Sequence, residues 1–148
     1  MQELLSIAGN SPNSIKLYEE ESPAIFYNAV IYGEITGTYT SQYSLIEGNT
    51  NFTNGNINAS GISVSDIFTD PANGDYTLKN GSVAVNAGNN DLFTGLDENT
   101  LDLAGNPRLF GTNIDLGAYE STFAPTSEHC LYATTWNGTS WSNGEPDY

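Results

Sequence analysis

Four carboxylates lie close together in one stretch of the chain, and paired carboxylates are the groups that hydrolyse glycosidic bonds. They are Asp91, Asp97, Glu98 and Asp102. In such enzymes one carboxyl group is an acid and the other a nucleophile or base, at a separation that sequence spacing does not give. Carboxylate oxygens also bind calcium, and the candidate ligands are Asp97, Glu98 and Asp102. We favour a solvated acidic loop over a calcium site and a calcium site over catalysis, so no catalytic residue is assigned.

Arg108 is the only arginine of the chain and lies between two aspartates, Asp102 and Asp115. A guanidinium group can hold a carboxylate through two parallel hydrogen bonds. Gly105 and Pro107 can bend the chain so that Asp102 approaches Arg108. We predict that Arg108 pairs with Asp102 or Asp115 and fixes the last strand of the fold. The alternative is a catalytic arginine that acts on an acidic sugar, and we favour the structural role.

Aromatic side chains form the one candidate binding surface. Exposed tyrosine and tryptophan rings stack on sugar rings and present a polar atom to the hydroxyl groups. The candidates for such stacking are Tyr27, Tyr32, Tyr39, Trp136 and Trp141. The alternative for any one of these rings is packing in the core.

The charge balance is strongly acidic, with 18 acidic residues against 3 basic ones and a formal net charge of -15. Lys16, Lys79 and Arg108 cannot neutralise a run of phosphates, so nucleic acid is excluded as a partner. No apolar run approaches the length of a membrane-spanning helix, and the single Cys130 cannot form an internal disulfide. The charge is explained by solubility or, alternatively, by an extracellular surface that binds calcium or repels other chains.

Short runs of strand-forming residues separated by turn signals fill most of the chain. The predicted strands are 15–18, 25–32, 38–46, 75–78, 83–87 and 113–120, and the only predicted helix is 1–7. Asn-Gly dipeptides, which favour the positive φ of tight turns, occur at 54–55, 73–74, 80–81 and 137–138. This pattern predicts an all-β protein.

Two segments that start 15 residues apart repeat one pattern: 28–33 (Asn-Ala-Val-Ile-Tyr-Gly) and 43–48 (Tyr-Ser-Leu-Ile-Glu-Gly). Short aliphatic strands that end at Gly or Asn are typical of a β-solenoid, whose corners need left-handed conformations. Because the spacing is shorter than the roughly 20-residue minimum of solenoid repeats, we interpret the segments as successive strands within coils. The alternative fold is a β-sandwich with longer strands. In a solenoid Asn28 would be a buried corner amide stacked on Asn or Ser of a neighbouring coil, and otherwise a surface turn residue.

Three phrases between Asn28 and Glu120 carry a resemblance to a known family. They are 43–48 with 56–58 and 66–68; Asp-Pro-Ala-Asn-Gly-Asp-Tyr-Thr-Leu at 70–78 with Gly-Ser-Val-Ala-Val-Asn-Ala-Gly at 81–88; and Asp-Leu-Ala-Gly-Asn-Pro-Arg at 102–108 with Asn-Ile-Asp-Leu-Gly-Ala-Tyr-Glu at 113–120. In this order they resemble the C-terminal coils and cap of secreted right-handed parallel β-helix proteins, the pectin-lyase-like group common among Bacteroidetes-type surface proteins. Val83 and Asn86 depart from the family pattern, which has Pro and Asp there.

The resemblance implies a structural cap. Its residues are Asp102, Gly105, Pro107, Arg108, Asp115, Gly117, Tyr119 and Glu120. We expect its last strand to close the end of the solenoid through Ile114, Leu116 and Ala118. A further phrase, Thr-Thr-Trp-Asn-Gly-Thr-Ser-Trp at 134–141, resembles the opening of another β module. The expected organisation is therefore terminal coils and cap in 1–120, a linker in 121–133, and the truncated start of a module in 134–148.

These observations predict a fold and a location more directly than a reaction. We expect a non-catalytic segment of a secreted or cell-surface protein that acts as a scaffold or as an adhesive surface in contact with polysaccharide or cell-surface glycan. The alternative is the C-terminal part of a polysaccharide lyase or glycosidase whose active coils lie upstream. No cofactor other than calcium is implied.

Overall fold

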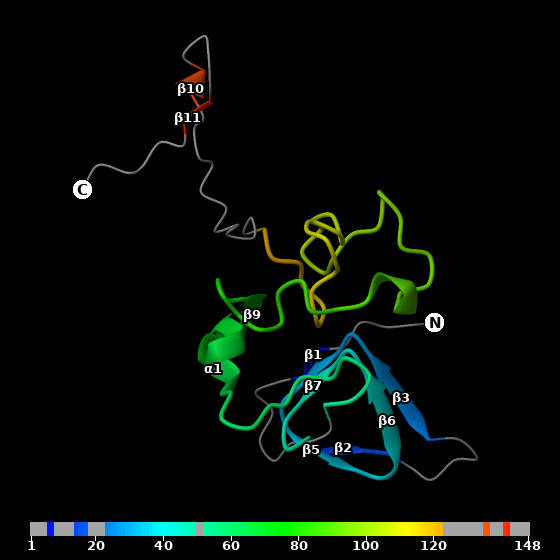
Figure 1. The fold of residues 1–148 in the computed structure, drawn as a ribbon. Helices are drawn as coiled ribbons and strands as arrows, with labels where there is room; N and C mark the ends of the chain where they lie inside the picture. Colours follow the sequence, from blue (N-terminus) through cyan, green and yellow to red (C-terminus); the bar gives the residue numbers. More distant parts are fainter. Residues whose placement is uncertain are drawn as a thin grey trace.

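The computed structural model describes residues 6–7, 14–17, 23–49, 52–122, 135–136 and 141–142. Its first half is built from short strands that lie in rows (Figure 1). They are β1 (Ser6–Ile7), β2 (Ser14–Lys16), β3 (Ala24–Tyr27), β4 (Val30–Ile31), β5 (Glu34–Thr36), β6 (Tyr39–Gln42) and β7 (Leu45–Ile46).

The strands of the first half pair in parallel and in a repeating order. β1, β4 and β7 form one sheet, β2 pairs with β5, and β3 pairs with β6. Partner residues of β3 and β6, such as Ala24 and Tyr39, are 15 positions apart, and the same offset separates Val30 from its partner Leu45. The two sequence segments 15 residues apart therefore occupy the same position in adjacent rows. The interpretation of them as successive strands within one coil is wrong, because three short strands and tight corners fit into 15 residues.

The corner that precedes each new row is formed by a residue with a left-handed backbone. Asn28 precedes β4 with φ 51° and Tyr43 precedes β7 with φ 47°. The Asn28 N–H donates to Gln42 O at 3.3 Å, and the Tyr43 N–H donates to Asn54 O at 3.0 Å. A tyrosine rarely adopts this conformation. Here its ring lies so close to Gly55 that a Cβ at position 55 would overlap it, so the corner is fixed by packing as well as by hydrogen bonds.

Alternate residues of β4 and β7 face two different hydrophobic clusters, as the pleat of a strand requires. Ile31 and Ile46 pack with Ala29 between the rows of strands, against the partly buried Ile15, Phe26, Ile35 and Tyr39. Val30 and Leu45 belong to the other cluster, which the second half of the chain completes with Ile67, Phe68, Leu78, Ala84 and Leu116, among others. The second half thus covers the outer face of the β1–β4–β7 sheet.

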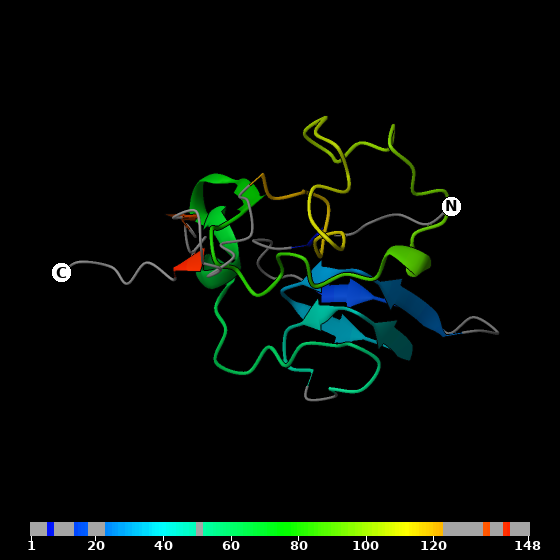
Figure 2. The same cartoon turned by 45° about the horizontal axis from the view of Figure 1, so that its top comes forward.

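Regular structure is sparse in the second half. Helix α1 (Val64–Ile67) leads into β8 (Phe68–Asp70), which pairs in antiparallel fashion with β9 (Asp75–Leu78) across the 3-10 turn η1 (Pro71–Asn73). Residues 79–122, which we call the cap segment, contain turns, the 3-10 turn η2 (Asn90–Leu92) and a bridge between Leu101 and Pro107. Figure 2 shows the cap segment on one side of the parallel strands. Further along, β10 (Thr135–Trp136) and β11 (Trp141–Ser142) form an antiparallel pair.

The predicted elements agree with the structure where strands are regular. The prediction 75–78 coincides with β9 and 15–18 overlaps β2, whereas 25–32 and 38–46 are each divided by a left-handed corner residue. The predictions 83–87 and 113–120 are wrong, because those segments form turns and bends in the cap segment. Of the predicted helix 1–7, the described residues Ser6 and Ile7 form a strand, and the rest lies outside the described residues.

The described residues contain many short strands and little helix, in line with the predicted all-β class. The expectation that Ile114 and Leu116 close the end of a solenoid is corrected in one respect. Leu116 packs with Val30 and Leu45 on the outer face of the sheet, so the cap segment covers a side of the rows. The expected linker lies, from residue 123 to 133, outside the described residues.

Candidate functional site

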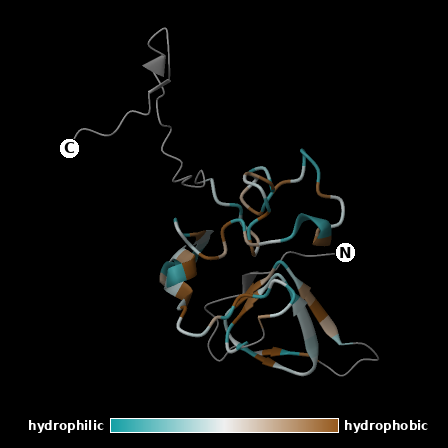
Figure 3. Cartoon of the chain, in the orientation of Figure 1, coloured by the Kyte–Doolittle hydropathy of each residue, from teal (hydrophilic) through white to brown (hydrophobic). Residues whose placement is uncertain are grey.

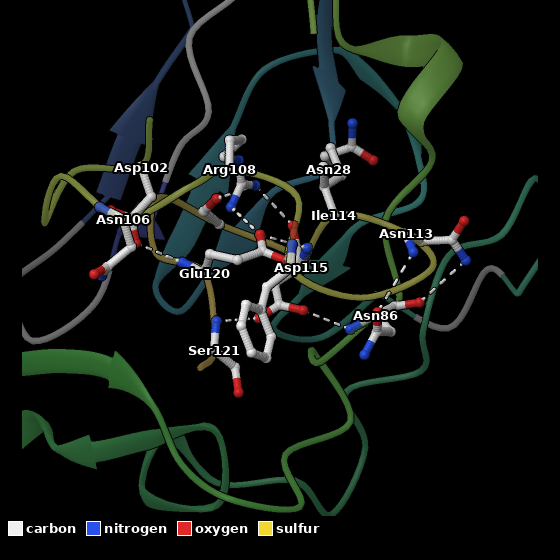
Figure 4. Close-up of polar contacts among 12 residues, drawn as sticks. Asn28, Asn86, Asp102, Asn106, Arg108, Asn113, Ile114, Asp115, Glu120 and Ser121 are labelled. Atoms are coloured by element: carbon white, nitrogen blue, oxygen red, sulfur yellow. Dashed lines mark hydrogen bonds and ion pairs between the residues drawn. The ribbon is translucent and has the colours of Figure 1, made fainter. Parts of the chain in front are cut away.

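The predicted cap residues converge on one buried charged group, the guanidinium of Arg108. Arg108 has no exposed surface. Its Nη1 donates to Glu120 Oε2 at 2.8 Å in an ion pair whose two side chains are 0% and 1% exposed. Its Nη2 donates to the carbonyls of Asp115 at 2.8 Å and Gly117 at 2.9 Å. The predicted carboxylate partner, Asp102 or Asp115, is therefore wrong: the partner is Glu120, and Asp115 contributes its backbone (Figure 4).

The two carboxylates nearest to Arg108 hold backbone N–H groups. Glu120 Oε2 also accepts the Asp115 N–H at 3.1 Å. The Asp115 carboxylate accepts the Asn86 N–H at 2.6 Å through Oδ1 and the Ser121 N–H through Oδ2. Asp115 is 1% exposed and Glu120 is 6% exposed. These side chains thus replace the strand hydrogen bonds that the segment lacks.

The third carboxylate, Asp102, organises the turn that precedes Arg108. Its Oδ1 accepts the N–H groups of Ala104 at 2.9 Å and Asn106 at 2.8 Å, and its Oδ2 accepts the Glu120 N–H at 2.9 Å. Gly105 has φ 85° and donates its N–H to Asp102 O at 3.1 Å, which needs a residue without a Cβ at that point of the turn. Asp102 therefore joins the predicted cap as a hydrogen-bond acceptor rather than as an ion-pair partner.

Burial and hydrogen bonding set the protonation of this cluster. Burial raises the pKa of Glu120 to about 7 and also raises the pKa of Asp115, although Arg108 and backbone donors oppose both shifts. Burial lowers the pKa of Arg108, against the attraction of the carboxylates. Burial also disfavours the charged form of Asp102, but the N–H groups of Glu120 and Asn106 outweigh it and its pKa is lowered. Glu120 is therefore the group of this cluster that titrates near neutral pH.

Two asparagines tie the cap segment together, and neither was predicted in that role. Asn28 is 1% exposed; its Oδ1 accepts the Asn89 N–H at 2.8 Å and its Nδ2 donates to Asn89 O at 3.1 Å. The prediction that Asn28 is a buried corner amide is confirmed, but it binds the cap segment and not Asn or Ser of a neighbouring row. Asn86 Oδ1 accepts the Thr112 N–H at 3.1 Å, and its left-handed backbone, φ 54°, was the available signal.

The remaining predicted cap residues take backbone roles. Gly117 donates its N–H to Asn28 O at 2.8 Å, while its own carbonyl binds Arg108. Pro107 forms the bridge with Leu101, and Tyr119 is half-buried. The predicted cap residues are thus brought together in space, and they act on the backbone of their own segment.

The aromatic residues predicted to stack on sugars are dispersed. Tyr32 is buried and donates its hydroxyl to Ile62 O at 3.0 Å, and burial raises its pKa to about 12, so its ring is unavailable. Tyr39 packs edge-on against Phe26 with ring centroids 5.7 Å apart. Tyr27 is half-buried. The side chains of Trp136 and Trp141 lie outside what the structure describes, which gives only the pairing of their backbones.

The acidic loop forms its own turn. Asp97 Oδ1 accepts the Asn99 N–H at 2.9 Å and the Thr100 hydroxyl at 2.8 Å, and these hydrogen bonds lower the pKa of Asp97. Asp102 faces the buried cluster instead, so it is separated from Asp97 and Glu98 in orientation. Within the described residues, no three His, Cys, Asp or Glu side chains are grouped to hold a metal ion. Calcium binding by Asp97, Glu98 and Asp102 remains a prediction.

A cavity of about 340 Å³ lies between the acidic loop and the chain around Arg108. Its lining is Leu96, Asp97, Glu98, Thr100, Pro107, Arg108 and Leu109. The guanidinium of Arg108 is engaged by Glu120 and by two carbonyls, so the free charges at this cavity are carboxylates. Sequence reasoning did not single out Leu96 or Leu109.

Comparison with known proteins gives no relative: no protein-family model, no curated protein and no solved structure matches the chain. Among the described residues, no helix is long and apolar enough to cross a membrane.

Proposed function

We propose that this chain is a non-catalytic structural segment of a secreted or cell-surface protein, in which β1–β7 are coils of a right-handed parallel β-helix and the cap segment covers one side of them. The parallel pairing, the constant offset of 15 residues and the shared left-handed corner at Asn28 and Tyr43 support coils. The right hand is proposed from the general handedness of parallel crossover connections. Secretion is proposed from the family resemblance.

The single observation that carries the structural role is the way the charged cap groups are used. Arg108, Asp115 and Glu120 are buried and bind one another or the backbone. A catalytic group must reach substrate, and these groups do not reach the surface. A buried charge that is paired and hydrogen bonded serves instead to fix one arrangement of a loop-rich segment. The alternative of Arg108 as a catalytic arginine for acidic sugars is therefore not favoured.

Contact with glycan belongs to this proposal as the role of the outward strand faces. Ile25 of β3 is 55% exposed, its neighbour Thr40 of β6 is exposed, and Tyr27 is half-buried beside them. Such a face offers a ring edge and hydroxyl groups to a sugar chain. The calcium prediction at Asp97, Glu98 and Asp102 is kept as a separate proposal, to be tested by the effect of a chelator on the melting temperature.

Affinity electrophoresis through gels cast with different polysaccharides tests the function. We expect the chain to be retarded in at least one gel without degrading it, and the variant Tyr27→Ser to be retarded less than wild type. The control Tyr119→Ser removes a half-buried tyrosine of the cap segment and should leave retardation unchanged. Cleared polysaccharide produced by this chain alone would contradict the proposal, whereas clearing by a longer parent chain alone would place catalysis upstream.

A further inference from the structure

The chain around Arg108 forms two short antiparallel arms. Leu101 and Pro107 form a bridge, the Arg108 N–H donates to Thr100 O at 2.8 Å, and the Asp102 N–H donates to Asn106 O at 2.8 Å. Successive residues of an extended chain point to opposite sides. Asp102 and Arg108 face inward and are buried, so their neighbours on each arm face outward.

The outward side of these arms is apolar. Leu101 is 58% exposed, Leu103 71% and Leu109 41%, and Pro107 between them is exposed as well. Figure 3 shows hydrophobic segments in the cap segment as well as along the strands. Phe110, which follows Leu109, is 48% exposed. Exposed apolar residues that gather in one place and are bordered by polar ones mark interaction surfaces.

The cavity next to these arms joins apolar and acidic groups. Leu96, Pro107 and Leu109 supply its apolar lining, and Asp97 and Glu98 supply carboxylates. We call these five residues the cap patch. Its volume of about 340 Å³ is at the small end of the range for ligand sites and suits one long side chain.

The charge of the surroundings selects the sign of the ligand. Between residues 80 and 122 the only basic residue is Arg108, which is buried and paired with Glu120. A second copy of this chain would bring carboxylates against carboxylates, since each copy has a formal net charge of -15. A sugar would find aliphatic side chains here instead of flat aromatic rings. A lysine or arginine side chain combines an aliphatic stem with a cationic end.

We propose that the cap patch binds a lysine- or arginine-bearing segment of another protein, whose aliphatic stem lies over Leu96, Pro107 and Leu109 and whose cationic end lies at Asp97 and Glu98. The inference requires only a folded cap segment. It is therefore independent of whether the strand rows serve as a scaffold or contact glycan.

The probe is a fluorescently labelled peptide of alternating leucine and lysine, titrated with the full chain and followed by anisotropy at low and high salt. We expect Glu98→Gln to weaken binding about three- to fivefold and Leu109→Ser to weaken it about tenfold. The matched controls are Glu34→Gln on β5 and Ile25→Ser on β3, which remove the same charge and a comparable exposed apolar side chain elsewhere. Both controls should bind the peptide as wild type does.

Peptides in which glutamate replaces lysine, or serine replaces leucine, separate the two parts of the site, and both should bind less tightly than the parent peptide. Equal losses for Glu98→Gln and Glu34→Gln would show attraction to the overall negative charge and would overturn the proposal. Self-association abolished by Leu109→Ser, without peptide binding, would overturn it in favour of a second copy. An unchanged melting temperature of Glu98→Gln and Leu109→Ser ensures that lost binding is not lost folding.

Discussion

The strand rows and the cap segment are stabilised by different interactions. In the rows, backbone ladders pair β1 to β7, and Ile31 and Ile46 pack in the space between them. In the cap segment, side chains replace the ladder: Asp102, Asp115 and Glu120 accept backbone N–H groups that would otherwise bond to a neighbouring strand. The comparison teaches that a segment with almost no regular secondary structure can still be specified, provided that each buried polar group has a partner.

Arg108 is where the cap segment is easiest to break. Arg108→Ala leaves the buried Glu120 carboxylate and two carbonyls without their donor, which is expected to cost about 3–5 kcal/mol. Thermal unfolding measured by circular dichroism checks this loss. Leu103→Ala, an exposed position of the same segment, is the control and should melt as wild type does. A wild-type melting temperature for Arg108→Ala would contradict the structural role of the pair.

The strand rows should fail by a different route. Ile31→Ala leaves a cavity between the rows and is expected to cost about 2–4 kcal/mol. Because no charge is involved, this loss should be the same in low and high salt, whereas the loss in Arg108→Ala should vary with salt. Urea unfolding at two salt concentrations measures both. Identical salt responses for the two variants would remove the distinction between the regions.

Asn28 connects the two regions and should show an intermediate effect. Asn28→Gly keeps the freedom to adopt a positive φ but removes both hydrogen bonds to Asn89, at an expected cost of about 1–3 kcal/mol. Asn54→Gly is the matched control, since Asn54 also has a positive φ, 57°, but is exposed. Chemical denaturation of both variants makes the comparison. A loss in Asn54→Gly as large as that in Asn28→Gly would mean that backbone conformation, and not the amide, explains the effect.

The smallest predicted effect is a pH dependence confined to the cap segment. Burial raises the pKa of Glu120 from 4.5 to about 7 in the folded chain, so the folded state binds this proton more tightly than the unfolded state. The stability from this group is fully present below pH 4.5 and is lost as pH rises through 7. Between pH 6 and 8 the loss is about 1 kcal/mol.

Unfolding free energies measured at pH 6 and pH 8 check this sign. Glu120→Gln should flatten the pH dependence, because the titrating group is gone, while Glu34→Gln removes the same charge at an exposed site and should retain the wild-type slope. Stability that rises between pH 6 and 8 in the wild type, and does so less in Glu120→Gln, would show that Arg108 holds the Glu120 pKa below its ordinary value.

The sequence allowed the regular half to be predicted better than the irregular half. β9 and the repeated pattern at 28–33 and 43–48 follow from local alternation and turn residues, which report short-range structure. The division of strands at Tyr43 could not be predicted, since tyrosine is a poor left-handed residue and its conformation depends on packing against Gly55. That same long-range dependence explains why the repeat was assigned to strands within a coil.

In the cap segment, composition indicated the participants but not their pairing. Arg108 was recognised as a structural cation, and its partner Glu120 was included in the cap. The choice between Asp102, Asp115 and Glu120 depends on how the chain folds back, which sequence distance does not determine. Tyr32 could not be identified as buried, because its place between the sheet and residue 62 requires the second half of the chain.

Native-state hydrogen exchange tests most directly the claim that buried side chains stabilise the cap segment. The informative amides are those that donate to its carboxylates, at Asn106, Asp115 and Glu120, compared with the row amides of Leu45 and Ile57. We predict protection of both sets in the wild type, and in Arg108→Ala a greater loss of protection in the cap amides than in the row amides. Unprotected cap amides in the wild type, or cap amides as protected in Arg108→Ala as before, would contradict the account.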